Sequence, residues 1–172
     1  MTHGGPPRLA YASTPAHTIA ALLPARGETL AVAETTAGGL ISSTLLAVPG
    51  ASAWFLGATV AYSPAARAVW LGLAPDTFAP HGAVSEPAAA MMAGAVRRTL
   101  GATWGLAETG IAGPQTGRRS AKPAGLAFVA VTGPVSRTRE LRTGLEDRSA
   151  NQAAFARAAI ELLAWALEQA AA

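Results

Sequence analysis

Apolar runs and helix-spaced apolar residues alternate along this chain. A helix is expected over residues 15–25, because Ile19 and its apolar neighbours share one side and Thr14 is a suitable N-terminal cap. The apolar run 29–33 that follows is typical of a buried strand. The alternation continues with strands expected at 55–62 and 103–109 and with helices expected at 38–47, 64–70 and 85–100.

The last part of the chain adds a hairpin and a long helix. Strands 126–132 and 136–142 are expected to pair across a Gly-Pro turn, and an amphipathic helix is expected over 149–170. Helices that alternate with strands, together with one hairpin, predict an α/β fold: a three-layer α/β/α sandwich with a mixed sheet. We expect a single domain, residues 15–172, behind a loose tail at 1–14.

Composition excludes several kinds of site. The 172 residues include no cysteine, so disulfides, thiolate zinc sites, iron–sulfur clusters and a cysteine nucleophile are excluded. Three scattered histidines leave little for a metal site, and we expect no metal. The length suits one domain with a substantial core.

Charge and hydropathy indicate a protein of the cytoplasm. The chain holds 43 alanines, which inflate its hydrophobic fraction of 51%, and it has no apolar run of about 18 residues that could span a membrane. Its first 12 residues lack the apolar run of a secretory signal. The pI is about 10.2, but the net charge is only +3 and the basic residues are dispersed, which disfavours nucleic acid as a partner.

Two of the expected strands end in turns of unusual composition. These are residues 34–39, Glu-Thr-Thr-Ala-Gly-Gly, and residues 109–114, Thr-Gly-Ile-Ala-Gly-Pro, which precede a polar loop expected to be flexible at 115–121. Ligands of open α/β sheets bind at the carboxyl ends of strands. Glycines allow close approach of a ligand, and the N-terminus of the next helix offers N–H groups to an anion or an oxyanion. Tight turns without a function have the same composition, so both interpretations stay open.

Several segments resemble motifs of the CinA C-terminal domain family. Residues 30–40 resemble the family's A-E-S-x-T-G-G-L signature, and the motifs at 81–86 and 109–114 match outright. Four further segments, 48–55, 60–67, 122–125 and 147–148, resemble the family's P-G-S-S-x-x-F, V-x-Y-S-N-x-x-K, K-P-V-G and G-D-R, in the same order. Larger members carry an extra N-terminal domain, for which we expect no room in 172 residues.

The resemblance implies an activity. Active members are nicotinamide mononucleotide (NMN) amidohydrolases, which convert NMN and water to nicotinic acid mononucleotide and ammonia. They are taken to use a serine nucleophile, a lysine base and a tyrosine, with no metal or other cofactor. Here Thr35 stands in the serine's place, Arg67 stands in the lysine's place and Tyr62 is kept. We therefore expect activity that is weak or altered.

Both replacements have alternative interpretations. The extra methyl group of Thr35 crowds attack by its hydroxyl, and the residue could simply cap the next helix. Arg67 stays protonated and cannot act as a general base, but it can bind a phosphate or a carboxylate, or it could be a surface helix residue. Lys122, the one lysine, could substitute as the base, although nothing in the sequence requires it.

The residues expected to bind substrate lie around the two glycine-rich turns and at the start of the last helix: Glu34, Thr36, Gly38, Gly39, Thr109, Gly110, Ala112, Gly113 and Arg148. Glu34 is either a ligand contact or an anchor for backbone N–H groups. Arg148 either binds a ligand phosphate or pairs with Glu146.

Two function hypotheses follow. The first is a nicotinamide-nucleotide amidase that acts through Thr35, with Tyr62 and Arg67 in supporting roles. The second is a catalytically degenerate protein that keeps the pocket for a pyridine nucleotide or another phosphorylated ligand. Both take a small-molecule nucleotide as the partner, and the resemblance implies a homo-oligomer. A purely structural module is a third and weaker alternative.

Overall fold

The apolar run near the start of the chain forms β1 (Leu30–Glu34), which is buried along its whole length because an apolar core covers each of its two faces. β2 (Phe55–Val60) and β3 (Trp104–Gly110) flank it, and both run parallel to it. β4 (Leu126–Thr132) and β5 (Arg137–Arg142) form the antiparallel hairpin that extends the sheet beyond β3. The strand order is β2-β1-β3-β4-β5, so the prediction of a mixed sheet is confirmed.

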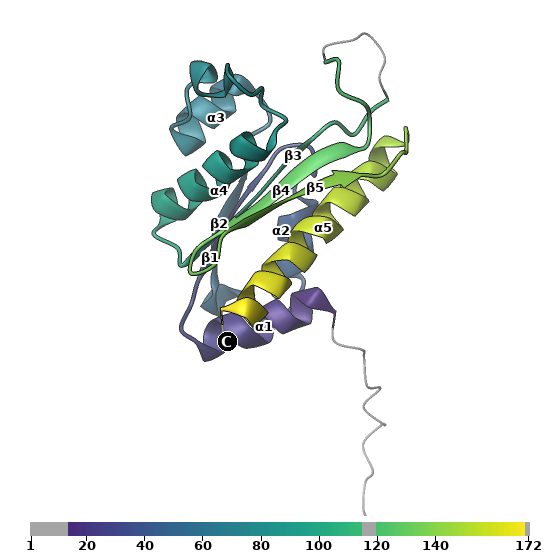
Figure 1. Ribbon diagram of the computed structural model, residues 1–172. Helices are drawn as coiled ribbons and strands as arrows, with labels where there is room; N and C mark the ends of the chain where they lie inside the picture. The colour runs from purple at the N-terminus through teal and green to yellow at the C-terminus, as the bar shows by residue number, and fades with distance from the viewer. Residues whose placement is uncertain (1–13, 115–119, 171–172) are drawn as a thin grey trace, which may run out of the picture.

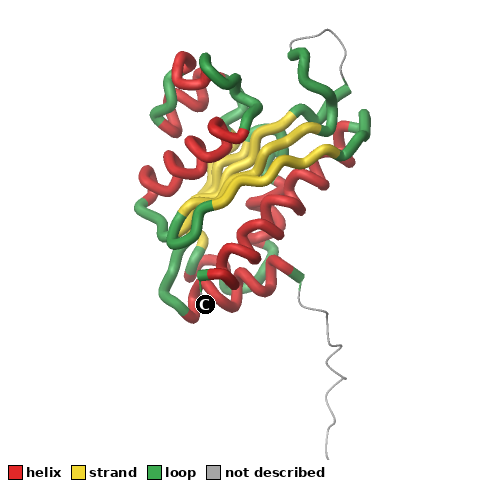
Figure 2. The backbone as a smooth tube through the Cα atoms, in the orientation of Figure 1, coloured by secondary structure: helices red, strands yellow, loops and turns green. Residues whose placement is uncertain are grey.

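Helices cover both faces of this sheet in the computed structural model, which describes residues 14–114 and 120–170 (Figures 1 and 2). The helices are α1 (Pro15–Ala25), α2 (Leu40–Leu46), α3 (Pro64–Leu71), α4 (Glu86–Leu100) and α5 (Arg148–Gln169), with short 3-10 turns η1 (Ala51–Ala53) and η2 (Pro75–Phe78). One layer holds α3 and α4, and the other holds α1, α2 and α5 (Figure 1). The predicted three-layer sandwich is therefore confirmed.

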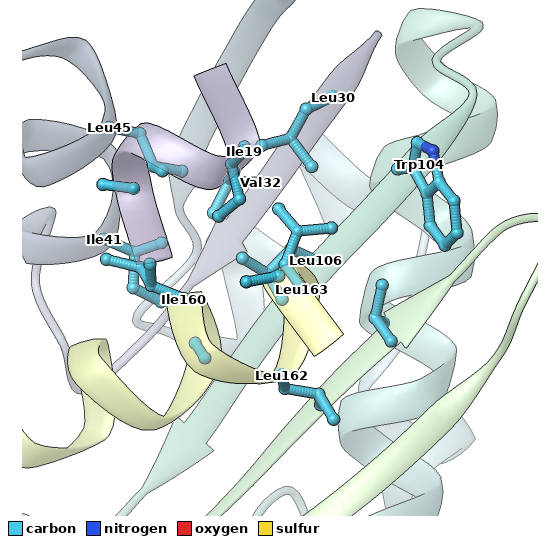
Figure 3. Packing of buried hydrophobic residues seen from close by; sticks show 14 of the residues in the cluster. Ile19, Leu30, Val32, Ile41, Leu45, Trp104, Leu106, Ile160, Leu162 and Leu163 are labelled. Carbon is cyan, nitrogen blue, oxygen red and sulfur yellow. The ribbon is translucent and has the colours of Figure 1, made fainter. Parts of the chain in front are cut away.

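The larger core lies between the sheet and the layer of α1, α2 and α5. Alternate residues of β1 and β3, such as Leu30, Val32 and Leu106, meet side chains from the three helices there (Figure 3). Removing this apolar surface from water stabilises the fold by about 25 cal/mol per Å². Trp104 ends the cluster, fully buried, and its indole N–H donates to the Glu28 carboxylate at 2.7 Å.

The opposite core is built from small side chains, which lets α4 approach the sheet closely. Ala93 of α4 faces Gly105 of β3, and a Cβ atom at position 105 would lie 2.1 Å from the Ala93 carbonyl oxygen. The alanine-rich composition thus has a structural use on this face, where Ala31, Ala33 and Ala107 line the sheet beneath α4.

The boundaries of the expected elements all lie within two residues of those observed, and two of the shifts bear on the site. β2 ends at Val60, so Tyr62 follows the strand instead of ending it. α2 begins at Leu40 because Gly38 and Gly39 have φ of 67° and 100°, which a helix does not accept. The expected tail, Thr14 apart, and residues 115–119 of the expected loop lie outside the described residues.

No helix among the described residues is both long enough and apolar enough to span a bilayer.

Candidate functional site

The two glycine-rich turns lie side by side because β1 and β3 are parallel neighbours. Ala33 pairs with Ala107 in the sheet, so both strands reach their carboxyl ends at the same edge. The hydroxyl of Thr36, just after β1, donates to the carbonyl oxygen of Gly110 at 2.7 Å. The structure therefore brings together the segments that the sequence analysis selected separately.

Thr35 begins the first turn, with 4% of its surface exposed. Its Oγ1 lies 3.3 Å from the main-chain oxygen of Glu108 and 3.3 Å from the hydroxyl of Thr36. The N-cap of α2 is Gly39, so Thr35 does not cap that helix. Its hydroxyl is thus free of a capping role, and its recorded partners within the described residues include no side-chain base.

Glu34, the last residue of β1, is a fully buried anchor. Oε2 accepts the N–H groups of Gly39 and Ile41 at 2.8 and 3.1 Å, and Oε1 accepts the N–H and the hydroxyl of Ser42. Four donors satisfy the lone pairs of this carboxylate. Of the two roles considered for Glu34, the contacts are those of the anchor.

Glu108 is a second buried carboxyl group on the neighbouring strand. Its Oε2 accepts the N–H groups of Thr35 and Ala37 at 3.2 and 2.9 Å, while its buried Oε1 has no recorded partner. Burial raises the pKa of Glu108 to about 7, and the nearby Glu34 adds to the rise against the lowering effect of the backbone N–H groups of Ala37, Thr35 and Thr36. This side chain therefore changes charge near neutral pH.

These contacts correct one expectation about the first turn. The sequence analysis expected N–H groups there to face an anion or an oxyanion. In the structure Glu34 and Glu108 accept the N–H groups of residues 35, 37, 39, 41 and 42. The chain's own carboxyl groups occupy the donors, because two acidic side chains lie at adjacent strand ends.

The glycines expected to admit a ligand have structural reasons to be glycine. Gly38 has a positive φ, and a Cβ atom there would lie 3.3 Å from the side-chain nitrogen of Gln152. A Cβ atom at Gly110 would lie 2.8 Å from the ring of Phe155. Close packing against α5 therefore accounts for both positions.

The second turn is held from both sides. Thr109 Oγ1 donates to the carbonyl oxygen of Ala83 at 2.7 Å, which ties β3 to the segment before α4. On the α5 side, the buried Asn151 donates to the carbonyl oxygen of Ala112 at 2.8 Å. Gln152 donates to the carbonyl oxygen of Thr36 at 2.9 Å, so α5 fixes both turns.

Tyr62 and Arg148 form a bridge along the rim of the site. Tyr62 is 59% exposed, and its hydroxyl oxygen accepts a hydrogen bond from Arg148 Nη2 at 3.2 Å. Arg148 Nη1 donates to the carbonyl oxygen of Gly113 at 3.0 Å. The end of β2, the second turn and the start of α5 are thereby joined, and two polar side chains are presented to solvent.

Arg67 is buried, with 9% of its surface exposed, so the surface alternative is wrong for this residue. Its guanidinium lies 5.3 Å from the centroid of the Phe78 ring, and Nη1 donates to the carbonyl oxygens of Ala61 and Tyr62 at 3.5 and 3.2 Å. Nε is buried without a recorded partner, and burial lowers the pKa of the side chain. A buried cation that contacts only neutral groups is costly unless an anion joins it.

Lys122 approaches the same end of the sheet from the loop before β4. Its ammonium group donates to the carbonyl oxygen of Val84, next to the residue that Thr109 contacts. Within the described residues, no group of three or more acidic or histidine side chains is placed to hold a metal ion.

The sequence analysis missed Glu108, Asn151 and Gln152. Glu108 had a usable signal, because a charged residue inside an otherwise apolar strand must either be paired or change its pKa. The two amides had none, since polar residues are ordinary in the first turns of a helix.

Comparison with known proteins gives a consistent result. A family model described as the CinA C-terminal domain matches residues 12–167. A CinA-like protein of Anaeromyxobacter sp. (strain K) is 45% identical over 151 residues, which are 87% of this chain and 36% of that protein. A CinA-like protein of Prochlorococcus marinus (strain MIT 9313) is 49% identical over 113 residues, 66% of this chain and 26% of that protein. The chain thus spans 26–36% of the length of these two relatives.

Solved structures match the fold over most of its length. A CinA superfamily protein from Klebsiella pneumoniae 700603 superposes with a TM-score of 0.82 at 29% identity, over 90% of this chain and 96% of that one. The competence/damage-inducible protein CihA from Agrobacterium tumefaciens superposes with a TM-score of 0.82 at 33% identity, over 90% of this chain and 94% of that one.

Proposed function

The chain belongs to the CinA C-terminal domain family, and on that premise we propose that it binds a phosphorylated pyridine nucleotide and slowly hydrolyses its carboxamide at Thr35. The substrate class comes from the family resemblance. The observation that carries the proposal is the state of Arg67, a buried guanidinium whose Nε has no recorded partner in the described part of the chain. A ligand phosphate would supply the missing counter-charge and acceptor.

The reaction assigned to this site is acyl transfer to a hydroxyl. Thr35 Oγ1 attacks the carboxamide carbon, its proton passes to the leaving nitrogen, and ammonia departs from a Thr35 ester. Water then hydrolyses the ester, which releases the carboxylate and restores the hydroxyl. Arg67 cannot carry the proton, because a guanidinium stays charged.

We assign the proton transfer to Lys122. It is the one lysine of the chain, and its contact with Val84 lies next to Ala83, which Thr109 near the end of β3 contacts. A neutral lysine can accept the hydroxyl's proton and then protonate the leaving nitrogen. A base on a loop is less well positioned than one on a helix, which is why slow turnover is expected.

The second candidate function is binding without turnover. The contacts of the Thr35 hydroxyl favour it, since a main-chain carbonyl and another hydroxyl do not activate a nucleophile. In this case Arg67 still binds the nucleotide, and Thr35 is a structural residue.

One experiment separates the two. Purified protein is incubated with NMN, and ammonia and nicotinic acid mononucleotide are measured against T35A, with calorimetry of NMN binding to both proteins. Turnover that T35A abolishes supports the amidase, whereas NMN binding with equal background rates supports the binding protein. If a folded protein neither binds nor hydrolyses NMN, both are rejected.

A further inference from the structure

We infer that Glu108 is a positioning residue of the Thr35 site and that its resting form is the neutral acid, with the proton on Oε1. Its consequence for ligand binding rests on the proposed function, whereas its protonation can be measured without a ligand. Glu108 lies on β3 beside the turn that follows β1, and none of its surface is exposed.

The two buried carboxyl groups at this edge differ in how well they are satisfied. Glu34 has four donors, two on each oxygen, which suits a carboxylate. Glu108 has two donors, both on Oε2, and its Oε1 has none recorded. A buried carboxylate oxygen without a donor is costly, and a proton on that atom removes the charge that causes the cost.

The neighbouring carboxylate of Glu34 also favours the neutral form of Glu108. Glu34 ends β1 and Glu108 lies one residue beyond the Ala33–Ala107 pair of the sheet, so two ionised side chains would repel each other out of reach of water. Of the α5 side chains at these turns, Asn151, Gln152 and Phe155 carry no charge, and the guanidinium of Arg148 is bonded to Gly113 and to the exposed Tyr62 at the rim. One ionised and one neutral carboxyl group is therefore the favoured arrangement.

Glu108 positions Thr35 through both its side chain and its main chain. Oε2 holds the N–H groups of Thr35 and Ala37, which fixes the turn on both sides of Thr36. The main-chain oxygen of Glu108 also accepts the Thr35 hydroxyl. Removing the carboxyl group would leave two N–H donors without their acceptor and would release residue 35 from its orientation.

Protonation also sets the charge beside the ligand. With Glu108 neutral, the turn contains one buried negative charge, that of Glu34. Ionisation of Glu108 adds a second beside Thr35, and an anionic nucleotide would then be repelled. The affinity for a phosphorylated ligand should consequently fall as the pH rises through the range where Glu108 loses its proton.

The first test reads protonation directly from the amide groups that Glu108 accepts. The ¹⁵N chemical shifts of Thr35 and Ala37 are followed from pH 5 to pH 9 in the wild type and in E108Q, without ligand. A transition near neutral pH in the wild type that is absent from E108Q is expected. A transition that persists in E108Q, or wild-type shifts that stay flat over this range, would overturn the inference.

The second test reads positioning. E108Q keeps an acceptor oxygen for the two N–H groups, whereas E108A removes it. We expect E108A to bind NMN at least tenfold more weakly at pH 7, with E108Q restoring most of the affinity. Equal affinity in E108A and the wild type would contradict the positioning role. Should E108A not fold, E108Q is compared with the wild type at pH 6.5 and pH 8 instead. The wild type should lose affinity more steeply than E108Q, in which residue 108 cannot titrate.

The two tests also separate this inference from the proposed function. If no variant binds NMN but the amide titration behaves as expected, the ligand assignment fails and the neutral Glu108 stands. If NMN binds but the amides of Thr35 and Ala37 do not titrate, the ligand assignment stands and the neutral form of Glu108 is rejected.

Discussion

Glu108 contacts Thr35 twice: its carboxyl Oε2 accepts the Thr35 N–H at 3.2 Å, and its main-chain oxygen lies 3.3 Å from the Thr35 hydroxyl. The residue in the family's nucleophile position is therefore oriented by a side chain of the next strand. Both contacts come from one residue of β3, so the position of Thr35 is fixed relative to the sheet.

Restoring the family's residues should increase turnover. The double variant T35S/R67K places a less crowded hydroxyl beside a side chain that can lose its proton, and general acid–base catalysis is worth about 10²–10⁴-fold. We expect ammonia release from NMN to rise by at least about tenfold over the wild type. The control is T35S alone, which keeps Arg67 and therefore has no lysine at position 67. If the double variant is no faster than the wild type, the pocket must differ from that of active members at positions other than 35 and 67.

Arg67 should recognise the phosphate of the ligand. Substitution R67Q removes the charge while it keeps a hydrogen-bonding side chain on the Phe78 ring, and a hydrogen bond to a charged group contributes about 1.5–3 kcal/mol. Calorimetry should show NMN binding that is roughly 10- to 100-fold weaker at that energy, with nicotinamide riboside, which lacks the phosphate, little affected. The matched control is R157Q, on the exposed side of α5. A similar loss in R157Q would point to general electrostatic attraction instead.

Stability should fall as the pH rises from about 4.5 to about 7, because of Glu108. Its folded pKa of about 7 lies above the ordinary value of 4.5, so the folded state holds this proton where the unfolded chain has lost it. Protonated Glu108 contributes about 3 kcal/mol to the free energy of unfolding. This contribution is complete below pH 4.5 and is lost as the pH rises through the folded pKa of about 7. Urea unfolding of the wild type minus that of E108Q, at pH 4.5 and pH 8, isolates this term. A difference that does not change with pH would refute it.

Gly105 should tolerate no side chain, although Gly94 in the helix packed against its strand should. A Cβ atom at position 105 would overlap the Ala93 carbonyl oxygen, and overpacking costs about 1–3 kcal/mol or more. At Gly94 the nearest atom is the flexible end of Arg98, 3.1 Å away, and alanine is the better helix former by up to about 1 kcal/mol. We expect G105A to lower the thermal midpoint and G94A to leave it equal or raise it. The reverse order would mean that α4 does not lie this close to β3.

Sequence patterns were sufficient for the layout of this fold because its elements carry strong local signals. Both α3 and α4 begin with a serine cap followed by a proline in the first turn, and the hydroxyls of Ser63 and Ser85 accept the N–H groups of Ala66 and Ala88. The boundary at Tyr62 was missed because an aromatic residue after an apolar run fits a strand equally well.

The site was less predictable because its contacts join distant parts of the chain. Motif order selected Thr35, Tyr62 and Arg67, but it carries no information on orientation. Arg67 turns toward Phe78 because α3 packs against η2. Arg148 reaches Tyr62 because the start of α5 lies near the residues that follow β2. Glu108 was passed over because one acidic residue in a strand has no partner in the linear sequence, whereas its partners lie across the sheet.

The contacts of Glu34 couple the local unfolding of α2 to that of β1. α2 has seven residues, too few to persist as an isolated helix, yet the amides of its cap Gly39 and of Ile41 and Ser42 are bonded to Glu34, the last residue of β1. Those amides can exchange with solvent only when they separate from the Glu34 carboxylate, which is buried at the end of β1. The short helix should thus open together with the sheet and not ahead of it, so that the backbone around Thr35 shares the slow hydrogen exchange of the core.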